Sequence, residues 1–320
     1  MAEERDILNA MEQNVKTNSL NAWILAARPK TLTGASVPVM IGAAMAYVDG
    51  GGWSAFQWLP ALLCFLFAFV MQIDANFVND YFDCLKGNDD SDTRLGPRRA
   101  CSEGWITLSA MRKGLVITTL LACIIGLPLV YYGGWEMIIV GVLCVAFCFL
   151  YTTKLSYLGL GDVLVLVFFG TVPVCLTYYV VMPKALQGIT WQVVVASIAC
   201  GLVIDTLLVV NNYRDRDNDK LVGKNTLIVR IGEKRAEQLY AVLGLLACSL
   251  MWGIFIFSDT DKPQLSICLL FFYFQLHITT ANKMKKIKQG KALNKVLGLT
   301  ARNMFVFGLL TTVGILILNR

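Results

Sequence analysis

Charged residues are scarce in this sequence. Lysine, arginine, aspartate and glutamate make up 16% of the 320 residues, whereas hydrophobic residues make up 56%. The mean hydropathy is +0.60. This shortage of charge excludes an ordinary soluble domain of this length and indicates a chain that crosses a membrane several times.

Histidine is almost absent, and the cysteines lack the spacing of a metal site or a disulfide framework. The single histidine, His277, has no second histidine or cysteine at ligand spacing, and none of the ten cysteines belongs to a CxxC pair. We therefore expect His277 and the cysteines, most of which lie in apolar runs, to be packing residues.

Complete nucleotide-binding motifs are missing as well. Gly159-Leu160-Gly161 is not followed by the third glycine of a dinucleotide-binding turn, and Gly223-Lys224 lacks the upstream glycine of a phosphate-binding loop. These departures argue against a nucleotide-binding fold. We also expect no nucleic-acid partner.

Long apolar runs are what the sequence has instead. Windows long enough to cross a bilayer, about 17 to 25 residues, can be drawn at residues 33–49, 58–80, 113–132, 135–152, 161–181, 190–211, 236–257, 263–281 and 299–318. The sequence thus predicts an all-α polytopic membrane protein, a single domain over residues 1–320 with nine transmembrane helices. Residues 1–22 are polar and unlike a cleaved signal, so we expect a short helix at the membrane surface.

Basic residues fall mostly on one side of the predicted membrane. When the connecting segments are assigned alternately to two faces, all but three of the 28 lysines and arginines share one face; the exceptions are Lys184, Lys262 and Arg320. The positive-inside rule places this face and the N-terminus in the cytoplasm, and the C-terminus outside. The basic connection 283–295 is best explained as an orientation signal and a contact for anionic membrane lipid.

Two short acidic motifs stand at the predicted cytoplasmic ends of the second and sixth spans. Asn79 and Asp83 are four residues apart, as are Asp215 and Asp219. If each helix continues, the members of a pair share one face and both pairs present oxygen ligands to a common point. Oxygen ligands suit Mg²⁺, which takes further ligands from water and substrate phosphates. The pattern predicts a diphosphate site in a central cavity that opens to the cytoplasmic side.

Other polar residues extend into the same two spans. Asp74 and Asn76 lie on the second span, and Asp205 lies deep in the sixth. Polar groups in hydrocarbon are costly unless they face a cavity. The roles of Asp74 and Asp205 stay open between a site function, including ion coupling in a transporter, and a buried, hydrogen-bonded acid.

Basic residues near the motifs are candidates to bind an anion. Arg28, Arg98, Arg99, Lys154 and Lys224 all lie on the predicted cytoplasmic face, and their side chains can pair with phosphate oxygens. An interfacial anchor is the open alternative for Arg28, and a solvated loop for Arg98. Asp162 opens the fifth span, where it is either an ordinary acid at a helix N-terminus or a site residue.

The combined motifs resemble those of the UbiA superfamily of membrane aromatic prenyltransferases. The similarity is closest to the branch that acts on 1,4-dihydroxy-2-naphthoate, and it runs through most of the chain. The similar segments are Arg28-Pro29-Lys30-Thr31-Leu32, Asn79-Asp80-Tyr81-x-Asp83, Gly87 with Gly96-Pro97, Gly159-Leu160-Gly161-Asp162 with Phe168-Phe169-Gly170, and Asn211-Asn212-x-Arg214-Asp215 with Gly223-Lys224-Asn225-Thr226-Leu227.

This resemblance implies a nine-helix bundle in a bacterial cytoplasmic (inner) membrane and a role in menaquinone biosynthesis. The implied reaction is the Mg²⁺-dependent transfer of a polyprenyl group from polyprenyl diphosphate to 1,4-dihydroxy-2-naphthoate. The transfer releases diphosphate, and loss of CO₂ from the prenylated ring gives demethylmenaquinol.

The resemblance and the motifs together give a set of expected site residues. The expected metal ligands are Asn79, Asp83, Asp215 and Asp219, and the expected catalytic residues are Asp83, Asp215 and Lys154. The expected substrate-binding residues are Arg28, Asn76, Arg98, Tyr151, Asp162, Asn211, Asn212 and Lys224. Aromatic rings that can line the cavity and stabilise an allylic cation are Tyr151, Phe168, Phe169 and Tyr178.

One position departs from the wider superfamily. The third position of the first motif, an aspartate in many members, is Gly87, and Asp89, Asp90 and Asp92 are the candidates to replace it. Two alternative functions stay open. One is transfer to another aromatic acceptor, such as 4-hydroxybenzoate, homogentisate or a chlorophyllide, and the other is an ion-coupled secondary transporter.

Overall fold

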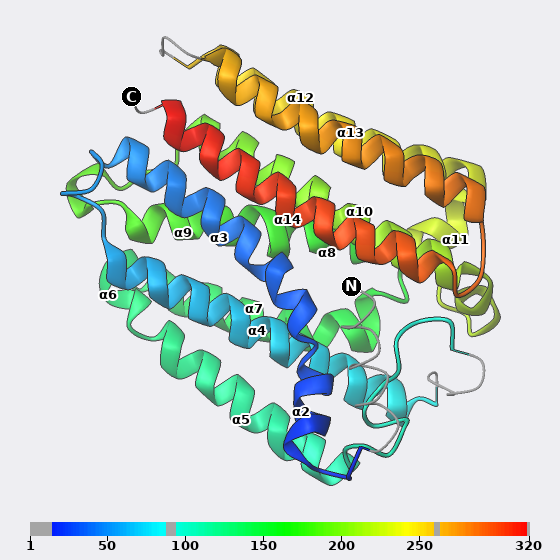
Figure 1. Cartoon of the computed structure of the whole chain (residues 1–320). Coiled ribbons are helices and arrows are strands. Elements are labelled where there is room, and N and C mark those ends of the chain that lie inside the picture. The colour runs from blue at the N-terminus through cyan, green and yellow to red at the C-terminus, as the bar shows by residue number, and fades with distance from the viewer. Residues whose placement is uncertain (1–14, 88–93, 259–262, 319–320) are drawn as a thin grey trace.

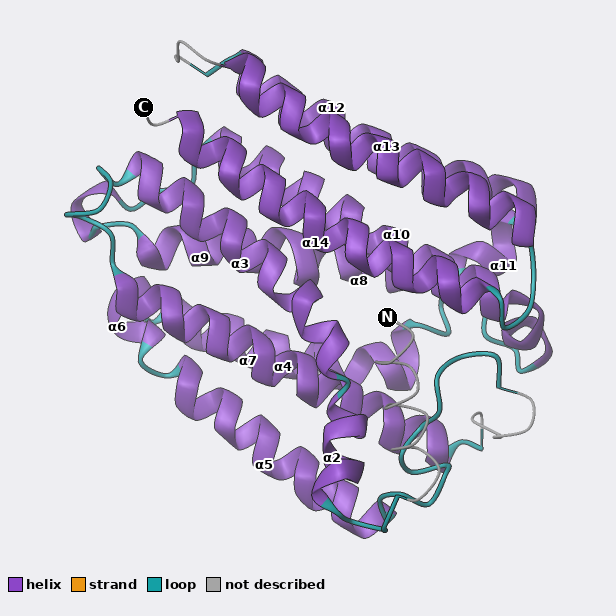
Figure 2. Ribbon diagram, in the orientation of Figure 1, coloured by secondary structure: helices purple, strands orange, loops and turns teal. Residues whose placement is uncertain are grey.

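The computed structural model describes residues 15–87, 94–258 and 263–318, and these residues form helices joined by loops, without a β-strand (Figures 1 and 2). Nine helical segments in this part of the chain are long and apolar enough to cross a membrane. The expectation of a nine-helix membrane bundle is therefore confirmed.

Four of the nine spans are single, uninterrupted helices in the first two thirds of the chain: α3 (Pro29–Asp49), α4 (Trp58–Leu85), α5 (Leu108–Gly126) and α10 (Trp191–Leu221). The last three spans are α12 (Glu233–Ile256), α13 (Pro263–Ile287) and α14 (Leu293–Leu318). Short helices join or precede the spans: α2 (Leu20–Ala27), α6 (Leu129–Gly133), η3 (Lys184–Leu186) and α11 (Leu227–Ile231).

The fourth and fifth spans each contain a π-helical turn. α7 (Glu136–Leu150) continues into η1 (Tyr151–Leu155), and α8 (Gly161–Val165) passes through η2 (Leu166–Thr171) into α9 (Val172–Val181). A π-helical turn inserts one residue into the helical register and is often found at functional sites. Here one of the two turns carries Tyr151 and Lys154.

Several boundaries differ from those expected. The expected second and sixth spans end at residues 80 and 211, whereas α4 and α10 extend to Leu85 and Leu221 and so carry both acidic motifs on helices. The expected third span was continuous to residue 132, but α5 ends at Gly126 and a new helix follows Pro128. Proline has no backbone N–H to donate, which accounts for the break.

The N-terminal helix is packed against the bundle. Residues 1–14 of the expected surface segment lie outside the described residues. α2 begins after Ser19, whose hydroxyl accepts a hydrogen bond from the N–H of Ala22 at 3.3 Å, a helix cap. Ala22 and Ala26 are buried in a cluster with Phe77 of α4, so this face of α2 belongs to the core.

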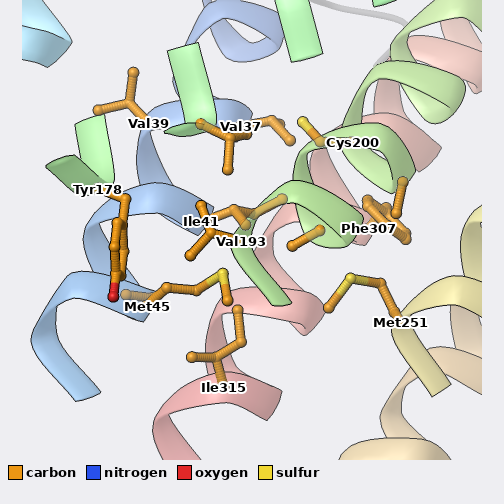
Figure 3. Close-up of a cluster of buried hydrophobic side chains, with 14 of the residues drawn as sticks. Val37, Val39, Ile41, Met45, Tyr178, Val193, Cys200, Met251, Phe307 and Ile315 are labelled. Atoms are coloured by element: carbon orange, nitrogen blue, oxygen red, sulfur yellow. The ribbon is translucent and has the colours of Figure 1, made fainter. Parts of the chain in front are cut away.

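The core lies where α3, α9, α10, α12 and α14 meet (Figure 3). Val37 and Ile41 of α3, Val193 of α10 and Phe307 of α14 have no exposed surface. Figure 1 shows α10 and α14 in the middle of the bundle, with α12 and α13 at one edge and α5 at the other. Two packed groups of helices result, and α3 connects them by contacting both α14 and α4.

Glycines allow η2 and α10 to approach closely. A Cβ atom added to Gly170 of η2 would lie 2.5 Å from the Cα of Gly201 on α10. The two backbones therefore touch, as small residues permit between helices in membranes. Because α10 carries the second acidic motif, this contact fixes its depth relative to η2.

We predict that Gly170→Ala lowers the melting temperature of the detergent-solubilised protein by several degrees, because the new methyl group meets backbone atoms that cannot turn aside. Gly298→Ala on α14 is the matched control, since a Cβ there meets nothing within 4 Å. The control should leave the melting temperature unchanged or raise it slightly, because alanine favours helix. Equal melting temperatures for the two variants would contradict the proposed backbone contact.

Candidate active site

The two acidic motifs lie at the same end of the bundle. α4 and α10 both finish there, and the loop 94–107 returns past the end of α4 toward α5 (Figure 1). The start of α14 lies at this end as well, since Asn294 is hydrogen-bonded both to Arg214 of α10 and to Leu95 of the loop. Three segments distant in sequence therefore surround one polar region.

The first motif has partners on three sides. The Asp83 carboxylate receives a hydrogen bond from Arg99 Nη2 at 2.9 Å, and the Asn79 side-chain oxygen accepts one from the Thr152 hydroxyl. Asn76 Nδ2 donates to the Ala27 carbonyl and to the Thr31 hydroxyl, both at 2.9 Å. Asn76 thereby fixes the junction between α2 and α3 against α4.

The second motif is held by cations of its own segment. Arg214 donates from Nε to Asp215 Oδ1 at 2.8 Å and from Nη2 to Asp215 Oδ2 at 2.5 Å. Lys224 Nζ lies 3.5 Å from Asp219 Oδ1, while Asp219 Oδ2 is buried without a hydrogen-bond partner among the described residues. An unsatisfied buried carboxylate oxygen is costly, which makes Asp219 well suited to receive a cation.

Asp80 is a structural residue that sequence reasoning missed. It is 1% exposed, and its two carboxylate oxygens accept the backbone N–H groups of Ala100 and Cys101, each at 2.9 Å. These bonds attach the loop 94–107 to α4 between the two motif residues Asn79 and Asp83. No sequence signal predicts them, because they join residues twenty apart through a loop of irregular shape.

Three arginines face the carboxylates. Arg28 lies between α2 and α3, and its left-handed backbone (φ 51°) separates the two helices. Its Nη2 atom is buried without a hydrogen-bond partner among the described residues. Burial, and then the charge of Arg99, lowers the pKa of Arg28 to about 9. In the same way burial and Arg99 lower the pKa of Arg94 to about 10. Both side chains stay cationic at neutral pH, and a bound anion would relieve the repulsion among them.

Two cations expected at the site point elsewhere. The Arg98 side chain is 57% exposed, with Nη1 3.7 Å from Glu103, and Lys154 is exposed on η1. The cation packed against this turn is Lys86, whose Nζ donates to the Thr153 carbonyl at 3.0 Å. The structure therefore brings Arg94 and Arg99 to the carboxylates instead of Arg98.

An apolar cavity of about 450 Å³ begins beside the first motif. Its polar end is formed by Asn79, Tyr151 and Thr152, and the rest is lined almost entirely by apolar side chains of α3, α4, α5, α7, η2 and α9. Phe168 and Phe169 line it, as expected. Tyr178 does not, because it lies in the core with its hydroxyl 2.8 Å from Asp49.

The remaining acidic residues in the spans have different surroundings. The Asp74 carboxylate accepts hydrogen bonds from the hydroxyls of Thr118 and Thr119 on α5, which is a structural role. Asp162 and Asp205 are each buried with Oδ1 lacking a hydrogen-bond partner among the described residues. Neither lines the cavity. Tyr151 is their neighbour at this end, since a Cβ on Gly161 would lie 3.7 Å from its hydroxyl.

Other expected residues are now placed. Asn211 accepts a hydrogen bond from Arg214 Nη2 at 2.8 Å, and Asn212 is buried on α10. His277 is buried, with its Nε2 3.0 Å from the Tyr240 carbonyl, so it is a packing residue, as expected. All ten cysteines are free; five of them are buried, whereas Cys123 and Cys268 are exposed. Asp89, Asp90 and Asp92 lie outside the described residues.

The donor set fits a divalent ion only when the substrate completes it. Within the described ranges, no three His, Cys, Asp or Glu side chains form a group that could hold a metal ion. The three expected aspartate ligands therefore do not form such a group by themselves, and the expected ligand set stays a prediction. The motifs form two halves of a site, and the charges of Asp83 and Asp215 both act on Arg94. Mg²⁺ ordinarily takes one or two carboxylates and completes its shell with water and phosphate oxygens.

The fold and this site define a membrane prenyltransferase: residues 35–297 match the model of the UbiA prenyltransferase family, and the chain belongs to this family. Its similarity to individual members is more specific. It is 37% identical over 245 residues to the 1,4-dihydroxy-2-naphthoate octaprenyltransferase of Escherichia coli (strain K12), covering 73% of this chain and 77% of the relative. It is 35% identical over 241 residues to the enzyme of the same name from Mycobacterium tuberculosis, covering 73% and 79%.

Solved structures agree on the fold. A UbiA homolog from Aeropyrum pernix K1 superposes with a TM-score of 0.66 at 14% identity, covering 89% of this chain and 97% of that one. A UbiA homolog from Archaeoglobus fulgidus bound to GPP and Mg²⁺ gives 0.62 at 13% identity, covering 91% and 99%. Family membership decides against the alternative of a secondary transporter.

We predict that Asp80→Ala loosens the loop 94–107, because two buried N–H groups lose a charged acceptor, at a cost of about 1–3 kcal/mol each. The Cys101 thiol, which is 9% exposed, should then react faster with a maleimide, as followed by mass spectrometry of its peptide. Glu103→Ala is the control, because Glu103 is another acidic residue of this loop and its carboxylate pairs with the exposed Arg98 at 3.7 Å. An unchanged labelling rate in Asp80→Ala would contradict the anchoring role.

Proposed function

We propose that this chain transfers a polyprenyl group from polyprenyl diphosphate to 1,4-dihydroxy-2-naphthoate, with loss of CO₂, to give demethylmenaquinol and diphosphate. The observation that carries the proposal is the position of two carboxylate motifs and three arginines at the polar end of an apolar cavity. The choice of acceptor is supported by the names of the relatives, several of which are 1,4-dihydroxy-2-naphthoate octaprenyltransferases.

The proposed cofactor is Mg²⁺, held by Asn79 and Asp83 on one side and by Asp215 and Asp219 on the other. The unpartnered Asp219 Oδ2 supports this assignment. When bound, Mg²⁺ would neutralise the diphosphate and so favour its departure. Asp83 and Asp215 already have arginine partners, so in the complex each guanidinium would share the carboxylate or turn toward a phosphate oxygen.

Cationic side chains would bind the rest of the diphosphate. Arg28 has a buried, unpartnered Nη2 at this end of the bundle, and Lys224 lies beside Asp219. Arginine binds phosphate through two parallel hydrogen bonds, which fixes the leaving group in orientation as well as in charge. For Arg98 and Lys154, both exposed, a phosphate contact requires a change of rotamer.

The cavity would hold the prenyl chain. Its apolar lining offers the chain an environment free of water, so that the allylic cation formed at C1 is protected from hydration. Tyr151, Phe168 and Phe169 line the cavity, and their ring faces can stabilise the positive charge. Asn79 and Tyr151 mark the place where the chain would meet the diphosphate.

The naphthoate acceptor would bind between Tyr151 and α10. Asp162, Asn211 and Asn212 belong to the elements around Tyr151 and offer hydrogen-bond partners for the hydroxyl groups of a naphthalenediol. Their side chains would orient the ring so that its electron-rich carbon faces the cation.

We also propose an orientation in a bacterial cytoplasmic membrane, with the site on the cytoplasmic face, the N-terminus inside and the C-terminus outside. The lysines of the connection 283–295 lie at the end of the bundle that carries the motifs, because Asn294 of this connection contacts Arg214. The positive-inside rule favours this face as the cytoplasmic one.

We predict that Asp83→Ala and Asp215→Ala each lower prenyl transfer by about 100-fold or more, because each removes a carboxylate that would hold the Mg²⁺ needed to neutralise the leaving diphosphate. Diphosphate release and prenylated product should fall together in purified protein supplied with Mg²⁺. Asp217→Ala is the matched control, since Asp217 is exposed on the same helix as Asp215 and should keep full activity. Retained turnover in both motif variants would overturn the proposed function.

We predict that, with one fixed polyprenyl diphosphate, the protein prenylates 1,4-dihydroxy-2-naphthoate at a rate at least about tenfold above 4-hydroxybenzoate or homogentisate. A site built to hydrogen-bond a particular acceptor rejects one whose polar groups do not match. Product formation measured by chromatography decides the matter. A higher rate with either other acceptor would assign the chain to a different reaction of the same type.

A further inference from the structure

Arg214 is a buried cation held by side chains of α10 and α14. Its side chain is 1% exposed, and its guanidinium donates to Asp215, to the Asn211 oxygen and, from Nη1 at 2.9 Å, to Asn294 Oδ1. A buried charge with this many fixed acceptors is held rigidly. Its orientation sets that of both Asp215 oxygens.

Asn294 passes this constraint to the loop. While its Oδ1 accepts from Arg214, its Nδ2 donates to the carbonyl of Leu95 at 2.8 Å, a residue 199 positions away. Arginine can only donate and a carbonyl can only accept, so these partners define which end of the amide is oxygen. One side chain thus joins α14, α10 and the loop 94–107.

The loop backbone comes close to the same guanidinium. A Cβ added to Gly96 would lie 2.8 Å from Arg214 Nη2 and 3.4 Å from Arg94 Nη2. A side chain at position 96 would therefore displace the Arg214 guanidinium and touch that of Arg94. The loop segment that carries Arg94 and Arg99 therefore packs directly against the Arg214 guanidinium, and the hydrogen bond from Asn294 to Leu95 fixes it in this position.

We propose that Asn294 is a positioning residue for the diphosphate site. It does not contact the substrate; it keeps the arginine-bearing loop and the Asp215 carboxylate in register, so that the two halves of the site face one anion. This inference rests on the function proposed above. It gives the C-terminal helix, whose sequence carries no recognised motif, a part in binding the donor.

Asn294→Ala tests the inference, with Asn303→Ala as the matched control. Asn303 is a second asparagine of α14 and is buried. Its Nδ2 donates to the Leu276 carbonyl at 3.1 Å and to Thr280 Oγ1 at 2.9 Å, and its Oδ1 accepts from Arg302. It contacts neither α10 nor the loop through these bonds. Asn294→Ala removes two hydrogen bonds of a side-chain amide and Asn303→Ala removes four, so both variants are expected to lower the melting temperature.

The two variants should differ in binding. Asn294→Ala is expected to raise the KM for polyprenyl diphosphate and for Mg²⁺ by about 10- to 100-fold, the usual effect of losing a residue that orients ligands, with a smaller fall in kcat and an unchanged acceptor KM. Asn303→Ala should keep all three KM values. Equal KM changes in the two variants, or none in Asn294→Ala, would overturn the inference.

A readout without turnover separates this inference from the proposed function. Inorganic pyrophosphate with Mg²⁺ should raise the melting temperature of the wild-type protein, and the concentration giving half of this rise should increase about 10- to 100-fold in Asn294→Ala but not in Asn303→Ala. Absence of prenylated product from the wild-type protein would instead contradict the proposed function.

Asn294→Asp provides a second variant in case the alanine variant does not fold. The new carboxylate still accepts a hydrogen bond from Arg214 but cannot donate to the Leu95 carbonyl. The contact with the loop is therefore lost, while the ion pair of Arg214 with Asp215 remains. Weakened binding of pyrophosphate with Mg²⁺ in Asn294→Asp is the expected result. Wild-type binding in this variant would show that the contact with the loop has no positioning role.

Discussion

A charged side chain buried in an apolar bundle has to be neutralised by close partners. The structure at the end of the bundle where α4 and α10 finish depends on that constraint. Arg214 and Asp80 are 2% and 1% exposed, and each is satisfied by partners from another segment. The desolvation of such groups is repaid only where geometry and hydrogen bonding are good. The ends of α4 and α10, the returning loop and the start of α14 are therefore held together by the charges that they bury. The constraint is met only in part at Arg28, whose Nη2 is buried without a hydrogen-bond partner among the described residues, which favours an anion with several oxygens.

The apolar cavity and the polar site are complementary because they share a boundary. Asn79, Tyr151 and Thr152 belong to the cavity lining, and Asn79 also belongs to the first motif. A substrate with a charged head and a hydrocarbon tail can satisfy both at once, whereas a soluble anion would leave the cavity without an occupant. The π-helical turn η1, which carries Tyr151 and Thr152, makes this boundary by bringing a ring and a hydroxyl to one face. Chemistry of an allylic cation needs this arrangement, since charge is handled on one side and water is excluded on the other.

The helices α12 to α14 carry neither of the two acidic motifs, yet α14 contributes Asn294 to the polar region around them. Their mutual packing relies on buried polar residues, among them Asn303 and Thr280, and on the contact of Gly244 with His277. This packing gives α14 a fixed position, and the first turn of α14 then presents Asn294 to both Arg214 and the loop. A rigid frame behind a polar site is what precise placement of ligands requires.

The sequence by itself determined the fold class, the nine spans and the two motif pairs, because length, hydropathy and helical spacing are local properties. It also identified the asparagine and aspartate pairs that the helices α4 and α10 carry. Only the tertiary structure decided which cations meet them. Arg99 and not Arg98 reaches Asp83. Asp80, which lies on α4, binds the backbone of the loop 94–107. Side-chain direction in an irregular loop, and contacts such as Asn294 with Leu95 across 199 residues, follow from how distant segments pack, and no local pattern encodes them.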